Sequence, residues 1–159
     1  MTQPGANHEA VAAPERCRIA VVASRFNDFI VERLLEGCTG KLAQCGVAAD
    51  RITLVRVPSA FELPLAAAAL ARSGGVDAVI ALGAVIRGET AHFDYIAAEC
   101  ARGLASVARE SLVPVIFGVL TVDNEQQALA RSADDEDNKG RAAAVAALQM
   151  VRVMGEIRP

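Results

Sequence analysis

Residues 83–92 bring together glycines and side chains that could bind an anion and move a proton. Gly88 is followed by Glu89, Thr90 and, two residues later, His92. A glycine-containing turn before a helix offers free backbone N–H groups, and with the Thr90 hydroxyl it could hold a small phosphate. An imidazole titrates near neutral pH, so His92 could serve there as a general acid or base. The alternative is structural: Gly88 and Thr90 form a tight turn and a helix cap, and His92 is solvated.

Two familiar nucleotide-binding motifs are missing from this stretch. Gly83 and Gly88 have the spacing of the phosphate loop of NTPases, but that loop needs Lys and then Ser or Thr after the second glycine. Here Glu89 follows Gly88. The G-x-G-x-x-G fingerprint of dinucleotide-binding folds is also absent. The sequence therefore favours neither a nucleoside triphosphate nor a nicotinamide cofactor.

Apolar runs alternate with helical patterns along the chain. Four short runs of the kind that forms buried parallel strands span residues 18–23, 51–57, 76–82 and 115–120. Helices are predicted from residue 27 or 28 to Gly46, after Pro64, and over residues 91–110, 125–131 and 139–155. The alternation of strands with helices predicts an α/β fold with three layers, α/β/α, and a four-stranded parallel sheet. We expect a flavodoxin-like strand order, 2-1-3-4.

The ends of the first helix carry recognisable signals. Apolar side chains recur every four residues from Ile30 to Leu42, which predicts one buried helical face. Asn27 or Asp28 should cap its start, and Gly46 should end it in a left-handed turn. Residues 1–15 lack such periodicity and are predicted to form a mobile tail with a solvated His8, so residues 16–159 should form a single domain.

Charge and composition exclude several classes of function. The chain has 159 residues and a net charge of −3, which provides no basic surface for nucleic acid. No apolar run is long enough to span a membrane, so we expect a cytoplasmic protein with no membrane partner. The four cysteines sit in apolar segments without metal-like spacing, so we interpret them as small core residues and expect no metal site.

The turns after the first three strands should meet at one edge of the sheet. They carry residues 24–27, 59–62 and 84–92. An exposed Phe26 could stack on a planar ring, and the Glu62 carboxylate could accept hydrogen bonds from the hydroxyls of a polyol. The alternatives are that Phe26 packs in the core against Ile30 and that Glu62 only stabilises a helix start.

Five segments together resemble the 6,7-dimethyl-8-ribityllumazine synthase family in order and spacing, from about residue 17 to residue 155. They are residues 25–27, 57–64, 83–95, 114–121 and 138–140. The resemblance implies a transferase of riboflavin biosynthesis. It would condense 5-amino-6-(D-ribitylamino)uracil with 3,4-dihydroxy-2-butanone 4-phosphate, releasing phosphate and water, in the penultimate step of that pathway. It implies no metal and no organic cofactor.

The resemblance also implies roles for particular residues. His92 would be the catalytic residue that moves protons. The phosphate would be bound by Gly88, Glu89, Thr90 and Arg131. The pyrimidine and its ribityl chain would be bound by Phe26, Ser59, Ala60, Phe61, Glu62, Ala84, Val85, Ile86, Phe117 and Lys139, with Phe117 supplied by a neighbouring subunit.

The family resemblance implies a homo-oligomer with active sites between neighbouring subunits. A homopentamer is the firmer expectation, a 60-subunit icosahedral shell is an extension of it, and an association with riboflavin synthase is a further implied partnership. Two rival hypotheses keep the fold without the reaction: a shell or binding protein that holds a flavin or lumazine, and a flavodoxin-like binder of phosphate or flavin.

The acidic run at residues 134–137 departs from the family, which usually has a small link containing Gly and Lys there. We expect these carboxylates to be solvated, to weaken binding of an anionic substrate and to make it more salt-sensitive. For Arg131, on the helix just before the run, the alternative to phosphate binding is a surface ion pair.

Overall fold

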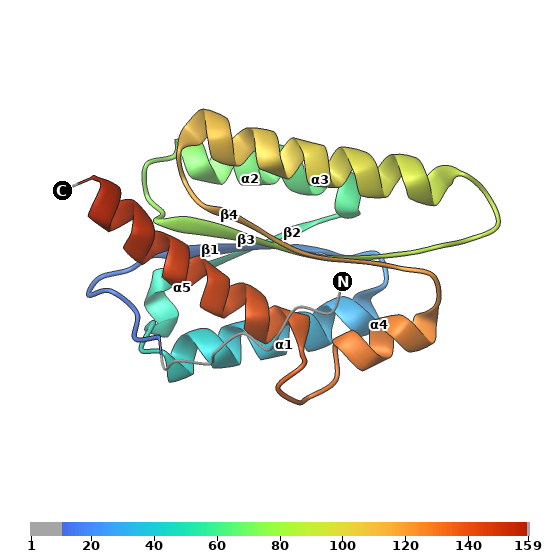
Figure 1. The fold of residues 1–159 in the computed structure, drawn as a ribbon, viewed down its shortest axis with the longest axis horizontal. Helices are drawn as coiled ribbons and strands as arrows, with labels where there is room; N and C mark the ends of the chain where they lie inside the picture. The colour runs from blue at the N-terminus through green and yellow to red at the C-terminus, as the bar shows by residue number, and fades with distance from the viewer. Residues whose placement is uncertain (1–10, 159) are drawn as a thin grey trace.

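The computed structural model describes residues 11–158 and contains one parallel sheet between two layers of helices (Figure 1). The strands lie in the order β2-β1-β3-β4, which confirms the predicted fold class and strand order. Their bounds are Ile19–Ser24 for β1, Ile52–Val57 for β2, Ala78–Ile86 for β3 and Val115–Val122 for β4.

Helices cover both faces of the sheet (Figure 1). One layer holds α1, α4 and α5, and the other holds α2 and α3. Their bounds are Asp28–Gln44 for α1, Leu63–Arg72 for α2, His92–Ser111 for α3, Glu125–Arg131 for α4 and Lys139–Ile157 for α5. Two short 3-10 helices, η1 at Ala49–Arg51 and η2 at Ala60–Glu62, precede β2 and α2.

The strand β1 shows why the sequence folds into three layers. All six of its residues are buried, because both faces of the sheet are covered. Ile19, Val21 and Ala23 belong to the apolar cluster beneath α1 and α5, whereas Ala20 and Val22 belong to the cluster beneath α2 and α3. A strand alternates its side chains between two faces, so one continuous apolar run serves two cores.

The third and fourth strands are longer than predicted. The third was expected to end at Leu82, but β3 continues to Ile86 because residues 83–86 pair with residues 119–122 of β4. The polar turn therefore begins at Arg87, and Ala84, Val85 and Ile86 lie on the end of a strand instead of in a turn. The correction has a simple cause: two strands extend each other by pairing, and that pairing is not visible in either segment alone.

Part of the predicted tail lies against the fold. Val11 is buried, and the Ala13 backbone N–H donates to the Cys45 carbonyl at 2.8 Å. The Arg152 guanidinium donates to the Ala12 carbonyl at 3.3 Å. Residues 11–13 of the predicted tail therefore contact the rest of the domain. His8 lies outside the described residues.

The cysteines behave as the composition indicates. Cys17, Cys38 and Cys100 are buried, Cys45 is partly buried, and all four are free thiols. Burial raises the pKa of Cys38 to about 12 and the pKa of Cys100 to about 11. None of the helices within residues 11–158 is both long enough and apolar enough to cross a bilayer.

Candidate active site

The turns after β1, β2 and β3 converge on one hollow of about 480 Å³ at the carboxyl edge of the sheet. This confirms the predicted meeting of Phe26, Glu62, Thr90 and His92. The sequence-predicted residues that line it are Phe26, Ser59, Ala60, Phe61, Glu62, Ala84, Val85, Ile86, Gly88, Thr90 and His92. Glu89 lies in the adjoining loop and is exposed, but it is not among the lining residues.

Three lining residues were not predicted as site residues: Asn27, Phe93 and Ile96. Phe93 and Ile96 lie on the first two turns of α3. Ile96 is four residues after His92 and three after Phe93, so it is a neighbour of both on the helix surface. That helical spacing is the signal that could have identified them.

Phe26 does not pack in the core. Its side chain is 68% exposed, whereas Ile30, its alternative partner, is completely buried. The Phe26 N–H donates to the Pro58 carbonyl at 3.0 Å, so backbone hydrogen bonds hold this turn beside the turn after β2. An exposed ring on a fixed backbone is suited to stacking on a planar ligand.

Asn27 starts α1 but does not cap it in the predicted way. It adopts a left-handed conformation, with φ 57° and ψ 45°, and its side chain makes no capping hydrogen bond. Instead its side-chain amide donates to the Ala84 carbonyl at 2.9 Å. Asn27 therefore ties the turn after β1 to the end of β3. At the other end of α1, Gly46 has φ +95°, which confirms the predicted left-handed stop.

Glu62 performs the structural role expected of a carboxylate at a helix start. Its Oε2 accepts hydrogen bonds from the Ser59 backbone N–H at 2.8 Å and from the Ser59 hydroxyl at 2.7 Å. The pair forms a capping box at η2. Both bonds use the same oxygen, and Oε1 forms no hydrogen bond with any described residue. Oε2 fixes the turn, which leaves Oε1 able to accept a hydrogen bond from a ligand hydroxyl.

The loop 88–91 between β3 and α3 carries unused backbone donors. The N–H groups of these four residues make no hydrogen bond within residues 11–158. The Thr90 hydroxyl accepts a long bond, 3.4 Å, from the His92 N–H, which opens α3 one residue later than predicted. Free N–H groups beside a helix start and a hydroxyl form a setting that binds anions.

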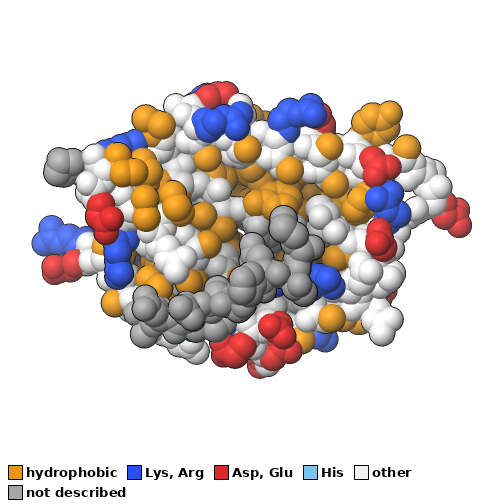
Figure 2. Space-filling model, in the orientation of Figure 1, with side chains coloured by type: hydrophobic (Ala, Val, Ile, Leu, Met, Phe, Trp, Pro, Cys, Tyr) orange, Lys and Arg blue, Asp and Glu red, His pale blue; other side chains and the backbone are white. Residues whose placement is uncertain are grey.

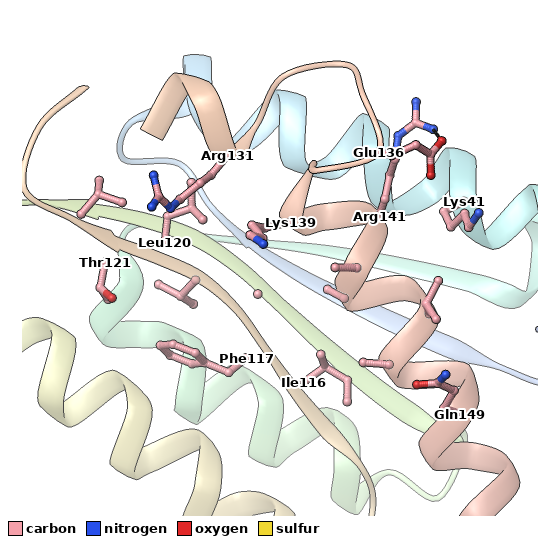
Figure 3. A pocket seen from close by; sticks show the side chains of 17 residues that line it. Lys41, Ile116, Phe117, Leu120, Thr121, Arg131, Glu136, Lys139, Arg141 and Gln149 are labelled. Atoms are coloured by element: carbon pink, nitrogen blue, oxygen red, sulfur yellow. Dashed lines mark ion pairs between the residues drawn. The ribbon is translucent and has the colours of Figure 1, made fainter. Parts of the chain in front are cut away.

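Three predicted site residues lie in a second hollow, of about 560 Å³, along the edge strand β4 and the start of α5 (Figure 3). They are Phe117, Arg131 and Lys139. In this chain they do not line the hollow that contains His92. The space-filling view shows hydrophobic side chains gathered over this face of the molecule (Figure 2), and Phe117 itself is 44% exposed.

Arg131 is not held in a surface ion pair. Its guanidinium donates to the Gln127 carbonyl at 3.1 Å, and it pairs with no carboxylate among the described residues. The structural alternative for Arg131 is therefore wrong within this part of the chain. Lys139 is also exposed at the start of α5. Four basic side chains line the second hollow, Lys41, Arg131, Lys139 and Arg141, and of these Arg141 is paired with carboxylates (Figure 3).

The segment Asn138-Lys139-Gly140 places Lys139 through the residues on either side of it. The Asn138 side chain is buried and accepts from the Gly140 N–H at 2.8 Å, while its amide donates to the Ala133 carbonyl at 2.9 Å. A Cβ on Gly140 would collide with the Leu34 carbonyl of α1. The flanking residues are therefore structural, and they hold the exposed Lys139 between them.

The acidic run is exposed, as predicted, and two of its carboxylates also pair with a neighbouring cation. The Arg141 guanidinium lies 2.7 Å from the Asp134 carboxylate and 3.5 Å from that of Glu136. Figure 3 shows Glu136 drawn toward Arg141, with Arg131 on the other side of the hollow. Two of the four carboxylates therefore share one guanidinium, a pairing that the sequence did not indicate.

Residues 16–155 match the model of a protein family described as 6,7-dimethyl-8-ribityllumazine synthase. The match includes the residues of both hollows.

Proposed function

The chain belongs to the 6,7-dimethyl-8-ribityllumazine synthase family, and from this premise we propose that it catalyses the condensation that names the family. The substrates are 5-amino-6-(D-ribitylamino)uracil and 3,4-dihydroxy-2-butanone 4-phosphate. The single observation that best supports the proposal is the hollow in which Phe26, Glu62, Thr90 and His92 meet.

The reaction needs proton transfers at each stage. The pyrimidine amine attacks the ketone and loses water to form an imine, and enolisation then expels phosphate. The second amine attacks the remaining carbonyl and loses a second water to close the ring. An imidazole with a near-neutral pKa can both give and take these protons. His92 lies exposed on the first turn of α3, two residues after Thr90. It can therefore serve a ketone whose phosphate is held by the neighbouring loop.

The remaining lining residues suit the pyrimidine substrate. Phe26 offers an exposed ring for stacking, and Glu62 retains an oxygen for the ribityl hydroxyls. The backbone at Val85 and Ile86 lies at the end of β3, where it can hydrogen-bond the ring edge. Holding two substrates in a fixed relation supplies much of the rate enhancement without further catalytic groups.

We propose that each complete site is shared by two subunits. Phe117, Arg131 and Lys139 line a different hollow from His92, so one chain carries two complementary halves. The helices that follow the second and third turns of the first hollow, α2 and α3, expose Leu65 and Tyr95, at 77% and 70%. Large apolar side chains that are exposed to this degree favour a protein interface. A ring of five subunits would join the halves, and a shell of sixty would be built from such rings.

Product formation tests the proposed reaction. The purified protein is mixed with both substrates, and lumazine absorbance and fluorescence are followed together with released phosphate. We expect both signals to rise together, and neither to rise when one substrate is omitted. Binding of a flavin or lumazine without phosphate release would instead favour the non-catalytic binder. Light scattering on the same sample measures whether the assembly is a pentamer or a shell.

A further inference from the structure

Arg87 stands where the chain leaves the sheet for the loop that borders the first hollow. Its backbone N–H donates to the Val122 carbonyl at 2.9 Å, the last bond between the ends of β3 and β4. The next four residues form the loop 88–91, and α3 begins at His92. Arg87 is thus the final residue anchored to the sheet before the proposed phosphate loop.

The Arg87 side chain joins three elements. Its Nε lies 3.2 Å from the Asp123 carboxylate in the turn after β4, and its Nη1 lies 3.1 Å from the Asp94 carboxylate in the first turn of α3. The guanidinium carbon lies 4.2 Å from the centre of the Phe93 ring, within the range of a cation–π contact. Because Phe93 lines the first hollow, the Arg87 side chain contacts one wall of that hollow.

The groups that hold Arg87 are themselves anchored. The Asp123 N–H donates to the Gln127 side chain of α4 at 2.8 Å, and the Asp94 N–H donates to the Ala91 carbonyl at 3.1 Å. The loop has few such ties of its own, since the N–H groups of residues 88–91 are unused within the described chain. Contacts at the two ends of the loop must therefore set its shape.

Arg87 is poorly placed to be the phosphate ligand itself. The hydrogen bond to Asp123, and to a lesser degree the bond to Asp94, raises the pKa of Arg87 above its usual value, so the guanidinium stays charged. Two carboxylates already compensate that charge. Because the Arg87 guanidinium already pairs with two carboxylates, it is better suited to joining the elements that carry them than to binding a further anion.

We propose that Arg87 is a positioning residue that clamps the first turn of α3 to the turn after β4. It thereby holds the loop 88–91 and His92 in the arrangement that binds the phosphorylated ketone. The clamp is a property of the structure, whereas its effect on substrate rests on the proposed function.

Hydrogen exchange tests the clamp without any substrate. In the full-length Arg87→Ala protein we expect the hydrogen-bonded amides of Asp94 and Asp123, at the two arms of the clamp, to exchange about tenfold faster than in the wild type, because local opening becomes easier. Arg72→Ala is the matched control, since it removes another exposed ion pair of α3, at 3.4 Å to Glu110. It should leave these amides unchanged. Equal exchange of the Asp94 and Asp123 amides in wild type and Arg87→Ala would overturn the clamp.

Kinetics then test its consequence. Arg87→Ala should raise the KM for the phosphorylated ketone about tenfold while leaving the KM for the pyrimidine within about twofold, because only the loop is loosened. Asp123→Asn removes one arm of the clamp. It should raise the amide exchange rates and the KM for the phosphorylated ketone by smaller factors than Arg87→Ala does. Arg87→Lys should restore part of the loss, since lysine keeps the charge but cannot bridge two carboxylates through a planar fork.

The outcomes separate positioning from its rivals. A higher KM with unchanged exchange would mean that Arg87 contacts substrate directly, and it would overturn the positioning role. An effect of Arg72→Ala equal to that of Arg87→Ala would show a general loss of stability and would also overturn it. If the wild-type protein forms no lumazine, the proposed function fails, while the exchange comparison still decides whether the clamp exists.

Discussion

His92 is the residue on which the proposed chemistry most depends. It is exposed in the first turn of α3 and lines the hollow that also contains Thr90 and Glu62. We predict that His92→Ala lowers kcat by about 10²- to 10⁴-fold without abolishing turnover, because substrate positioning persists when general acid–base catalysis is lost. Steady-state kinetics at saturating substrate measure this. Unchanged kcat would remove His92 from the mechanism.

Arg131 should act on substrate affinity. Its guanidinium makes no ion pair within residues 11–158, so it is available to a phosphate. Arg131→Ala should raise the KM for the phosphorylated ketone about tenfold to a hundredfold, which corresponds to a charge-assisted hydrogen bond of about 1.5–3 kcal/mol. The KM for the pyrimidine serves as the internal control. A change in thermal stability with unchanged KM would return Arg131 to a structural role.

The buried thiols give the protein a pH dependence on the alkaline side. Burial raises the pKa of Cys38 from 9.0 to about 12 and that of Cys100 to about 11. Below about pH 9 these thiols are protonated in both folded and unfolded chains, so their contribution is constant. Above it the unfolded chain loses protons first, and stability should fall until the folded pKa values are passed. Denaturant unfolding in steps from about pH 8 to pH 11 measures this decline.

The alanine variant at each of these two cysteines checks the assignment. Removing a raised-pKa thiol should flatten the alkaline fall in unfolding free energy, even where the cavity lowers stability at every pH. An equally steep fall in both variants would assign the effect to other groups.

The start of α5 depends on a close helix crossing. A Cβ on Gly140 would collide with the Leu34 carbonyl of α1, whereas Gly155, on the same helix, has open space around it. We predict that Gly140→Ala destabilises the protein by about 1–3 kcal/mol, the usual cost of overpacking, and displaces Lys139. Gly155→Ala should stabilise α5 by about 0.5–1 kcal/mol as the matched control. Chemical denaturation of both variants compares the two effects, and equal effects would contradict the crossing.

Some boundaries of helices and strands are set by neighbouring residues in the sequence, and others are set by tertiary contacts. The bounds of α4 and the stop of α1 at Gly46 agree with sequence prediction because capping and helical periodicity are carried by adjacent residues. The predicted end of the third strand, Leu82, is four residues too early, because residues 83–86 become strand only through pairing with β4. Likewise, the compensation of Asp134 by Arg141 depends on a side chain beyond the acidic run.

On the scale of the whole molecule, the two separated hollows predict complementation between subunits. His92→Ala and Arg131→Ala each damage a different half of the proposed shared site. Refolded together in equal amounts, they should form about one quarter of interfaces with both halves intact if subunits mix at random. Activity should therefore exceed the sum of the separate variants, measured as lumazine formation at matched protein concentration. Simple additivity would place each complete site within one chain.

The sequence by itself determined the α/β class, the strand order, and the convergence of three turns that carry Phe26, Glu62 and His92. The class and the convergence follow from hydrophobic periodicity, turn residues and the rule that parallel strands end at one edge, and the strand order is the one typical of flavodoxin-like folds. Only the tertiary structure decided that Glu62 keeps one oxygen free, that Arg87 bridges two carboxylates, and that Arg131 and Lys139 face a separate hollow. The physical reason is that pairing, burial and hydrogen bonding join residues far apart in the chain.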